Sequence, residues 1–489
     1  MDSFWNSITQ DYLSSQSVIT LRALARRANL DYEQMSPSDM MKALLDKKAE
    51  LVAAEEAAAA TKLVDGKPRI KRTVPQPVQP SPTPSALFPP VVTASQPATP
   101  TVEISDVSSC EVREGILEIL PDGYGFLRAC AYRNTPKDAY VPAQRIRRYN
   151  LRMGDMVKAY TRAQAEGKPP AVVAVISVNG HEEWNPEAKR ATFENFTPVY
   201  PSDRLRMELD GKRTDLAMRC IDLLAPIGKG QRAMVVSPPK AGKTTLLKMI
   251  ANSITTNHPE VELMVLLIDE RPEEVTDMQR SIKGEVIYST FDEECDNHIK
   301  VAELTLARAK RRVEEGKDVV ILLDSLTRMA RANNVVVPSS GKTLSGGVDP
   351  VALYFPKKFF GAARNIEHGG SLTVIATALV DTGSRMDDIV YEEFKGTGNM
   401  ELHLDRRLSE KRIFPALDLA KSGTRKEELL LTQKELEGEY NLRRLLASGD
   451  NQAATEAILS LMSRSSTNAE FLTSLELYIA KLKKDGTRM

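Results

Sequence analysis

One stretch limits the possible folds of this chain more than any other, and it spans residues 235–246. A β-branched apolar run leads into a loop of small residues, after which Gly242, Lys243 and Thr244 open an amphipathic helix. A strand, a loop and a helix in this order form a cradle for phosphate, because backbone N–H groups and the helix N-terminus face the anion. Lys243 is expected to reach the outer phosphates, and the Thr244 hydroxyl is expected to bind Mg²⁺. The stretch predicts a phosphate-binding site.

The first half of this loop departs from the usual pattern G-x-x-x-x-G-K-[ST]. Ser237 stands at the first glycine position, and Pro238 and Pro239 after it have no N–H group to donate. The second half of the loop is therefore expected to make most of the phosphate contacts. The predicted nucleotide-binding residues of the loop are Pro239, Lys240, Ala241, Gly242, Lys243, Thr244 and Thr245.

Composition fits a globular chain of several domains. The chain has 489 residues, of which 42% are hydrophobic and 27% charged, with a formal net charge of zero, so any basic surface must be local. No apolar run has the length of a membrane span and the N-terminus lacks a signal-peptide pattern, so no membrane contact and a cytoplasmic location are expected. Four widely separated cysteines favour neither a zinc site nor a disulfide framework.

Shifts in composition divide the chain into five parts. The first is a helical unit in which Ser36 is expected to cap a helix, and the second is an Ala/Glu tract followed by proline repeats, which predicts a disordered linker. Short alternating strands, a polar connector and a long α/β region follow. The expected boundaries are 1–50 for the helical unit, 51–109 for the linker, 110–178 for a small β-barrel, 179–215 for the connector and 216–489 for the α/β domain with its C-terminal helices.

The barrel region carries aromatic residues in a pattern that suits nucleic acid. Tyr124 and Phe126 alternate with glycines on one expected strand, and Arg128 and Tyr140 lie nearby. Rings can stack on bases and basic side chains can contact phosphates. Any one aromatic residue on a β-strand, however, is more often part of the hydrophobic core. The expected strands are 116–120, 124–128, 138–141, 152–157 and 171–175. A dense run of arginines lies close to the aromatic residues (Arg145, Arg147, Arg148 and Arg152).

The long region predicts a mostly parallel sheet between helices. Its apolar runs at 233–236, 263–268, 319–323 and 372–376 alternate with helical patterns, as in α/β proteins. Ligands bind at the carboxyl ends of such strands, where Asp324 is expected to hold Mg²⁺. Glu270 is expected to act as base or to position water, with Asp269 as its rival, whereas Glu273 and Glu274 are expected only to face the dipole of a helix that starts at Pro272.

Other polar segments are harder to interpret from chemistry alone. Two glycine-containing loops, 340–348 and 381–385, follow strand-like runs, and such loops are often functional. Arg412 and Arg425 come late in the domain, where an arginine can reach the phosphates of a neighbouring subunit, although a surface salt bridge is the simpler interpretation. Residues 429–482 read as helices that pack on the domain.

Together these segments resemble the bacterial transcription termination factor Rho family, whose members are hexameric RNA-dependent ATPases and helicases of the RecA-like class. The resemblance covers about residue 111 to the C-terminus and rests on DGYGFLR (122–128), PPKAGKT (238–244), DERPEEV (269–275), KFFGAARN (358–365) and SGTRKEE (422–428). It implies a RecA-like motor behind an OB-like barrel and a helical unit. It also implies a homohexamer that uses ATP and Mg²⁺, binds pyrimidine-rich single-stranded RNA and acts on the RNA polymerase elongation complex.

The resemblance also implies roles for individual residues. Glu270 would be the catalytic carboxylate, Arg425 the arginine finger from a neighbouring subunit, Arg412 a γ-phosphate sensor and Phe414 the residue that stacks on adenine, with Lys243, Asp324 and Arg271 at the nucleotide. The primary RNA site would be Tyr124, Phe126, Arg128 and Tyr140, and the secondary site in the central pore would be Lys342, Leu344, Ser345, Gly346, Gly347, Gly383 and Arg385. Tyr124 and Arg385 stand where the family usually has Phe and Lys, Ser237 replaces a more usual Ala, and the proline-rich segment is atypical.

Two other classes of protein compete with this interpretation. A rotary or secretion ATPase with a RecA-like core also has a barrel before its motor and a Glu after the second strand. Such a protein has no reason to place Tyr124, Phe126 and Arg128 on one glycine-flanked strand. A nucleic-acid-binding module with an inactive ATPase is disfavoured because Lys243, Thr244, Glu270 and Asp324 are all present.

Overall fold

The computed structural model describes residues 36, 38–39, 41–43, 45–47, 110–129, 132–165, 167–211, 215–447 and 451–484. The chain forms two compact units, residues 1–97 and 98–489. In the first unit the Ser36 Oγ accepts the N–H of Asp39 at 3.3 Å, as expected for a helix N-cap. The predicted linker 51–109 lies outside the described residues.

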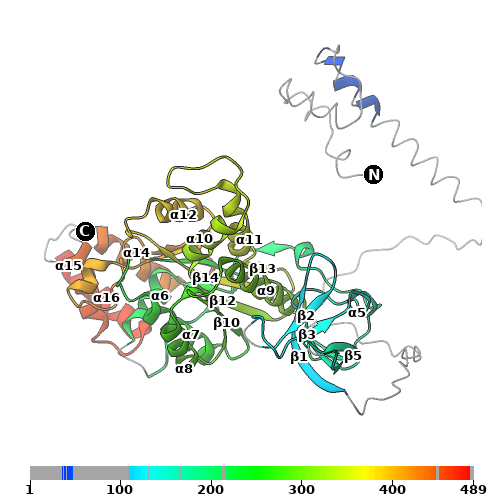
Figure 1. The fold of residues 1–489 in the computed structure, drawn as a ribbon. Helices are drawn as coiled ribbons and strands as arrows, with labels where there is room; N and C mark the ends of the chain where they lie inside the picture. The colour runs from blue at the N-terminus through cyan, green and yellow to red at the C-terminus, as the bar shows by residue number, and fades with distance from the viewer. Residues whose placement is uncertain are drawn as a thin grey trace, which may run out of the picture. The chain divides into compact units, whose positions relative to one another are not determined.

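The second unit begins with a closed five-stranded barrel in the order β1-β2-β3-β5-β4 (Figure 1). Leu117, Leu127 and Val157 are fully or almost fully buried in its core. The predicted OB-like barrel is therefore confirmed. Its strands are β1 (Glu111–Ile119), β2 (Gly125–Arg128), β3 (Ala139–Val141), β4 (Met156–Arg162) and β5 (Ala171–Val178).

One expectation for the barrel was wrong in detail, and one element was not anticipated. The fourth strand starts at Met156 and not at Arg152, because Asp155 accepts the N–H of Arg152 at 2.7 Å and so closes a turn. Gly154 takes a positive φ of 88° in this turn, where a Cβ would meet the backbone of Ala307 at 2.4 Å. Most of the arginine run lies on a short helix, α5 (Ala143–Arg148), which the sequence pattern did not indicate.

The motor domain is built on a sheet in the order β11-β10-β12-β14-β9-β15-β16. Neighbouring strands from β11 to β15 run parallel, and the antiparallel β16 closes one edge, so the prediction of a mostly parallel sheet is confirmed. The strands are β9 (Arg232–Ser237), β10 (Glu262–Glu270), β11 (Glu285–Thr290), β12 (Asp318–Asp324), β14 (Ser371–Leu379), β15 (Met400–His403) and β16 (Gly423–Thr424). The short strand β13 (Arg364–Ile366) pairs with β14, β6 (Pro198–Val199) pairs with β13, and β7 (Arg204–Leu205) and β8 (Ile227–Gly228) form a separate pair.

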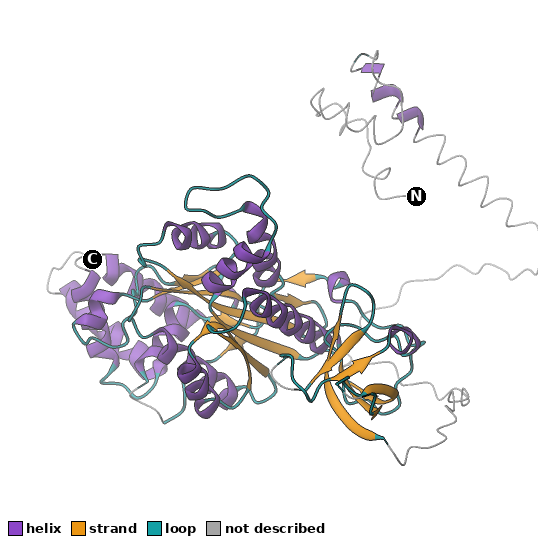
Figure 2. Ribbon diagram, viewed as in Figure 1, coloured by secondary structure: helices purple, strands orange, loops and turns teal. Residues whose placement is uncertain are grey.

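Helices cover both faces of this sheet (Figure 2). Because side chains alternate along a strand, Ala233 and Val235 of β9 join one core while Met234 and Val236 join the other. The described helices of the motor are α6 (Leu216–Leu224), α7 (Lys243–Asn257), α8 (Pro272–Ser281), α9 (Cys295–Glu314), α10 (Leu326–Val336), α11 (Tyr354–Gly361), α12 (Arg385–Lys395), α13 (Arg406–Glu410), α14 (Gln433–Ala447), α15 (Asn451–Met462) and α16 (Asn468–Lys484).

The two faces carry different helices. Helices α6, α7 and α14 to α16 contribute to the first core, and α9 to α12 contribute to the second. In the part of the chain that the structure describes, every helix is too short or too polar to cross a membrane. The carboxyl ends of the parallel strands are left open between the two helical layers, and the candidate site lies there.

Candidate nucleotide and nucleic-acid sites

The loop between β9 and α7 forms one wall of a pocket of about 580 Å³. Helix α7 begins at Lys243 with Gly242 as its N-cap, and Gly242 takes a φ of 93° that a side chain would disfavour. The free N–H groups at this helix start are suited to bind an anion in the pocket. The pocket is lined by Ser237, Pro238, Pro239, Lys240, Gly242, Lys243, Thr244, Thr245, Glu270, Arg271, Glu274, Arg328 and Leu379.

Lys243 and Asp324 form the charged centre of the pocket. The Lys243 Nζ donates to Asp324 Oδ1 at 2.5 Å, and Thr377 Oγ1 of β14 donates to the same oxygen at 2.8 Å. Asp324 ends β12, which is separated from β9 by β14, so the sheet order brings these three residues together. The structure thus places two residues that the sequence assigned to the nucleotide in direct contact.

Glu270 lies beside this centre and is 3% exposed. Its Oε2 is 3.9 Å from Lys243 Nζ and accepts no hydrogen bond from any residue that the structure describes. Burial raises the pKa of the Glu270 carboxyl, and the charge of Asp324 raises it further, against the opposing charges of Lys243 and Arg328. A buried carboxylate with a free oxygen is suited to hold and activate a water molecule.

A β-bulge separates Glu270 from its rival Asp269. Pairing of β10 with β11 shifts register between Ile268 and Glu270, and Asp269 has a φ of 56°. The bulge turns Glu270 into the buried pocket, whereas Asp269 stays partly exposed and accepts a bond from Arg328 Nη1 at 3.2 Å. This geometry favours Glu270 over Asp269 for chemistry in the pocket.

Three residues at the pocket were missed by the sequence analysis. Arg328 lies 3.6 Å from Glu270 Oε1, and Thr377 contacts Asp324, but neither position has a sequence signal without the sheet order. Glu274 was expected only to face the helix dipole, yet it accepts a bond from Thr244 Oγ1 at 3.3 Å. Its place in the first turn of a helix after a strand was the one available signal.

A second, apolar pocket of about 270 Å³ adjoins the loop. Phe414 contributes to its lining and is 54% exposed, so its ring is accessible for stacking on a base. Arg412 and Arg425 are exposed and are not among the described residues that line either pocket. The lining residues are Leu216, Ala217, Ala241, Gly242, Thr245, Leu246, Met249, Leu404, Phe414, Pro415, Ala416 and Leu417.

Three rings form a cluster on the barrel. The ring centroids of Tyr124 and Phe126 are 6.0 Å apart, those of Tyr124 and Tyr140 are 5.6 Å apart, and those of Phe126 and Tyr140 are 5.9 Å apart. All three residues are partly exposed, and Phe126 borders a groove of about 470 Å³ with the exposed Lys168 on its edge. Partly exposed rings beside a groove provide stacking faces for bases.

Arg128 has a different place from the one expected for a phosphate contact. Its side chain is 9% exposed, and its guanidinium pairs with Glu118 and, at 2.7 Å, with Asp138. It also lies 4.8 Å from the centroid of the Phe126 ring. Arg128 therefore lies on the same face of β2 as Phe126, contacts its ring through a cation–π interaction and lines the same groove.

The two glycine-containing loops lie against each other. A Cβ on Gly346 would meet the backbone oxygen of Arg385 at 3.2 Å, so the loop approaches the start of α12 closely. Most residues of both loops assigned to a pore are exposed, including Lys342 and Arg385. The sequence did not indicate that these segments would be neighbours.

Helix α10 connects these loops to the nucleotide pocket. At its first turn Arg328 contacts Glu270, and one turn later Arg331 donates twice to the buried Asp387 at 2.8 and 2.6 Å. Asp387 belongs to the first turn of α12, and Asn334 of α10 donates to the carbonyl of Gly347 at 3.1 Å. One helix face thus touches the catalytic carboxylate candidate and both loops.

Family models match both halves of this arrangement. Residues 217–424 match the ATP synthase alpha/beta family, nucleotide-binding domain, and residues 113–183 match the Rho termination factor, RNA-binding domain. Among solved structures, an ATPase from the type III secretion system of pathogenic bacteria is similar at 22% identity and a TM-score of 0.48, covering 63% of this chain and 93% of that one.

Curated proteins give a higher similarity. Transcription termination factor Rho of Haemophilus influenzae is 57% identical over 362 residues, which cover 73% of this chain and 86% of that protein. The proteins of the same name from Allochromatium vinosum and Escherichia coli K12 are 56% and 55% identical over 368 residues, covering 74% of this chain and 88% and 87% of those proteins.

Proposed function

Because this chain belongs to the transcription termination factor Rho family, we propose that it hydrolyses ATP to move along nascent single-stranded RNA and terminates transcription by RNA polymerase. The chain is an RNA-dependent ATPase with an RNA-binding barrel, and its barrel is of the Rho type, which decides against a rotary or secretion ATPase without a nucleic-acid substrate. The observation that carries the proposal is the free, buried oxygen of Glu270 beside Lys243, in a motor joined to that barrel.

In the proposed reaction, Lys243 binds the outer phosphates and Glu270 orients and deprotonates the attacking water. Glu270 is suited to the base role because burial makes its carboxylate more basic than a solvated one. The oxygen groups of Thr244, Asp324 and the adjacent Glu274 suit Mg²⁺, which would neutralise charge on the phosphates. Arg271 lines the pocket and is assigned to the phosphates, and Phe414 is assigned to the base.

We propose that the complete site forms between protomers of a homohexamer. Arg425 is exposed at the end of β16, where its backbone N–H donates to the Asn399 carbonyl at 2.8 Å, so its side chain is free to meet a neighbour. An arginine supplied by another subunit stabilises charge on the transferring phosphoryl group. Arg412, also exposed, is assigned as a γ-phosphate sensor.

RNA is proposed to bind at two places. Tyr124, Phe126 and Tyr140 hold pyrimidine-rich RNA on the barrel, with Arg128 beside Phe126. The pore loops form the second place, which comprises Lys342, Leu344, Ser345, Gly346, Gly347, Gly383 and Arg385. Helix α10 contacts both the segments that carry the loops and Glu270. Binding of RNA at the loops can therefore shift α10 and change the position of the catalytic carboxylate. The RNA polymerase elongation complex is the proposed partner, and the cytoplasm, where transcripts are made, is the proposed location.

ATP hydrolysis by the intact chain is expected to be slow without RNA and to rise by roughly one to two orders of magnitude with poly(C), the usual size of coupling between two sites. Steady-state ATPase assays with and without poly(C) measure this, with double-stranded DNA of equal charge as the control. Full turnover without any polynucleotide would refute an RNA-driven motor.

Phe126→Ala is expected to weaken binding of a short oligo(C) by about 1–3 kcal/mol, or roughly 5- to 150-fold, because one stacking face is lost. Fluorescence anisotropy with labelled oligo(C) measures the change. Tyr160→Ala is the matched control, since Tyr160 is a partly exposed aromatic on β4 outside the ring cluster. Equal losses in the two variants would mean that the cluster is not the RNA site.

A further inference from the structure

The apolar pocket beside the phosphate loop has two walls that face α7. One wall is the first turn of α6, with Leu216 and Ala217, and the other is the segment 414–417 that includes Phe414. The lining is mostly apolar side chains, so it offers few hydrogen bonds by which to distinguish one base from another. Discrimination by such a pocket depends on shape and on the distance between its walls.

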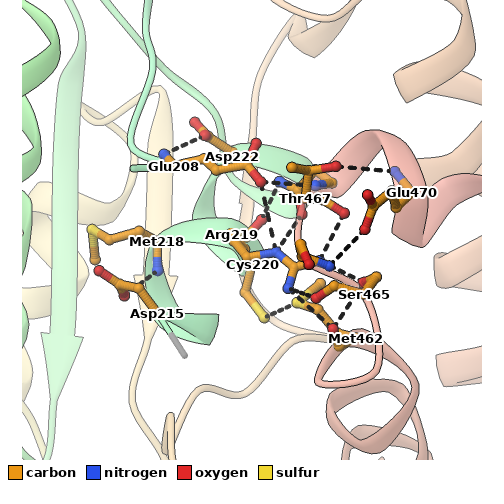
Figure 3. A network of polar contacts seen from close by, with 12 residues as sticks. Glu208, Asp215, Met218, Arg219, Cys220, Asp222, Met462, Ser465, Thr467 and Glu470 are labelled. Atoms are coloured by element: carbon orange, nitrogen blue, oxygen red, sulfur yellow. Dashed lines mark hydrogen bonds and ion pairs between the residues drawn. The ribbon is translucent and has the colours of Figure 1, made fainter. Parts of the chain in front are cut away.

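The α6 wall is held by one fully buried arginine. Arg219 is 1% exposed and directs its guanidinium into the turn between α15 and α16 (Figure 3). All five of its N–H groups are used. They donate to Asn468 Oδ1 at 3.2 Å, to the carbonyls of Met462, Ser465 and Thr467 at 3.0, 2.9 and 2.9 Å, and to Ser465 Oγ at 2.8 Å.

Asn468 in the same turn also donates hydrogen bonds back toward α6 and the segment before it. Asn468 Nδ2 donates back to the carbonyl of Arg219 at 3.0 Å, and the Asn468 N–H donates to Glu208 at 2.8 Å. Glu208 is also the carboxylate nearest to the Arg219 charge, at 3.7 Å. A buried guanidinium with every donor satisfied in a planar fork fixes both orientation and distance, so Arg219 holds α6 against the turn between α15 and α16.

A second arginine connects α14 to the C-terminal end of α6 and to the segment that follows the wall with Phe414. Arg443 Nη2 donates to the carbonyl of Leu224, at the end of α6, at 2.9 Å. Its Nη1 donates to the carbonyl of Leu419 at 3.0 Å, two residues beyond the wall that holds Phe414. The buried Glu439 anchors Arg443 at 2.5 Å, and Lys411 adds an exposed link to Gln452 of α15 at 2.7 Å.

We propose that α14 to α16 act as a clamp that sets the separation of the two walls, which makes Arg219 and Arg443 positioning residues for selection of the nucleotide base. The inference rests on the proposed nucleotide site and assigns to the C-terminal helices a role beyond packing. When the clamp loosens, the walls separate, and the base loses contact on both faces while the phosphate contacts of Lys243 and Thr244 stay in place.

Arg443→Ala tests the clamp with the full-length protein. We expect the KM for ATP to rise about tenfold and the ratio of kcat/KM for ATP over UTP to fall by a similar factor, with kcat and oligo(C) affinity within about twofold of wild type. Arg444→Ala is the matched control, because it is the next residue of the same helix and is exposed. Arg443→Lys keeps the charge without the fork and is expected to restore only part of the discrimination.

Unchanged KM and base discrimination in a folded Arg443→Ala protein would overturn the clamp, as would a loss confined to kcat. If thermal melting shows that Arg443→Ala is unfolded, Arg443→Lys decides, because it removes the fork and keeps the charge, and a KM and base discrimination equal to wild type in that variant would contradict the proposal. Lys243→Ala distinguishes failure of the nucleotide site from failure of the clamp. Undiminished hydrolysis in that variant refutes the nucleotide site itself, whereas its inactivity together with an unchanged Arg443→Ala refutes only the clamp.

Discussion

Glu270→Gln is expected to lower RNA-stimulated ATP hydrolysis by a factor of about 10² to 10⁴, because the amide cannot accept the proton of the attacking water. The substitution preserves shape, and the free oxygen of Glu270 makes no hydrogen bond with a described residue that the change would break. Binding of ATP and of oligo(C) should therefore stay within about twofold of wild type. A steady-state ATPase assay together with equilibrium binding of a fluorescent ATP analogue measures both quantities.

Glu273→Gln provides the matched control for this result. Glu273 is exposed in the first turn of α8, three residues from Glu270, and contributes only to the favourable charge at the helix start. It should retain nearly full activity. If both variants hydrolyse ATP like wild type, Glu270 is not the base, and Asp269 becomes the residue to test.

Arg425→Ala is expected to reduce kcat by about 10³ to 10⁵, the usual contribution of an arginine finger, while each protomer still binds ATP. The reason is that Arg425 is exposed and does not line the pocket formed by the described residues of its own chain, so its proposed target is the neighbour's phosphate. Loss of one exposed side chain should leave the melting temperature nearly unchanged.

Mixing two inactive variants shows whether Arg425 acts between protomers. In a co-assembled mixture of Glu270→Gln and Arg425→Ala chains, some interfaces between protomers combine an intact Glu270 with an intact Arg425 from the neighbouring protomer. ATPase activity should therefore reappear in the mixture, although neither variant is active alone. If the mixture stays as inactive as its parts, Arg425 works within its own chain or not at all.

Sequence reasoning located the pocket because its signals are local. The phosphate loop, Asp324 and Glu270 each follow an apolar strand directly, and the carboxyl ends of parallel strands share one edge of a sheet. Thr377 and Arg328 were not found, because their contacts arise from the order β12-β14-β9 and from the direction of α10. A single sequence does not show which distant segments of the chain pair with each other.

In the barrel, too, the local pattern was predictable and the contacts between distant segments were not. The alternation around Tyr124 and Phe126 predicted a strand with rings on one face, and the rings do cluster there with Tyr140. The sequence alone did not reveal that Arg128 pairs with Glu118 and Asp138, since those carboxylates come from other strands or loops. The C-terminal helices were read as packing, and the buried Arg219 at their turn was not anticipated.

The central claim is that ATP hydrolysis driven by RNA ends transcription. The most direct measurement is release of transcripts from a stalled or moving RNA polymerase elongation complex in vitro, with the intact chain and ATP. The account predicts shortened, released transcripts with wild type, and full-length transcripts with Glu270→Gln or with a non-hydrolysable ATP analogue. Robust RNA-stimulated ATPase activity with every transcript running to the end of its template would contradict it.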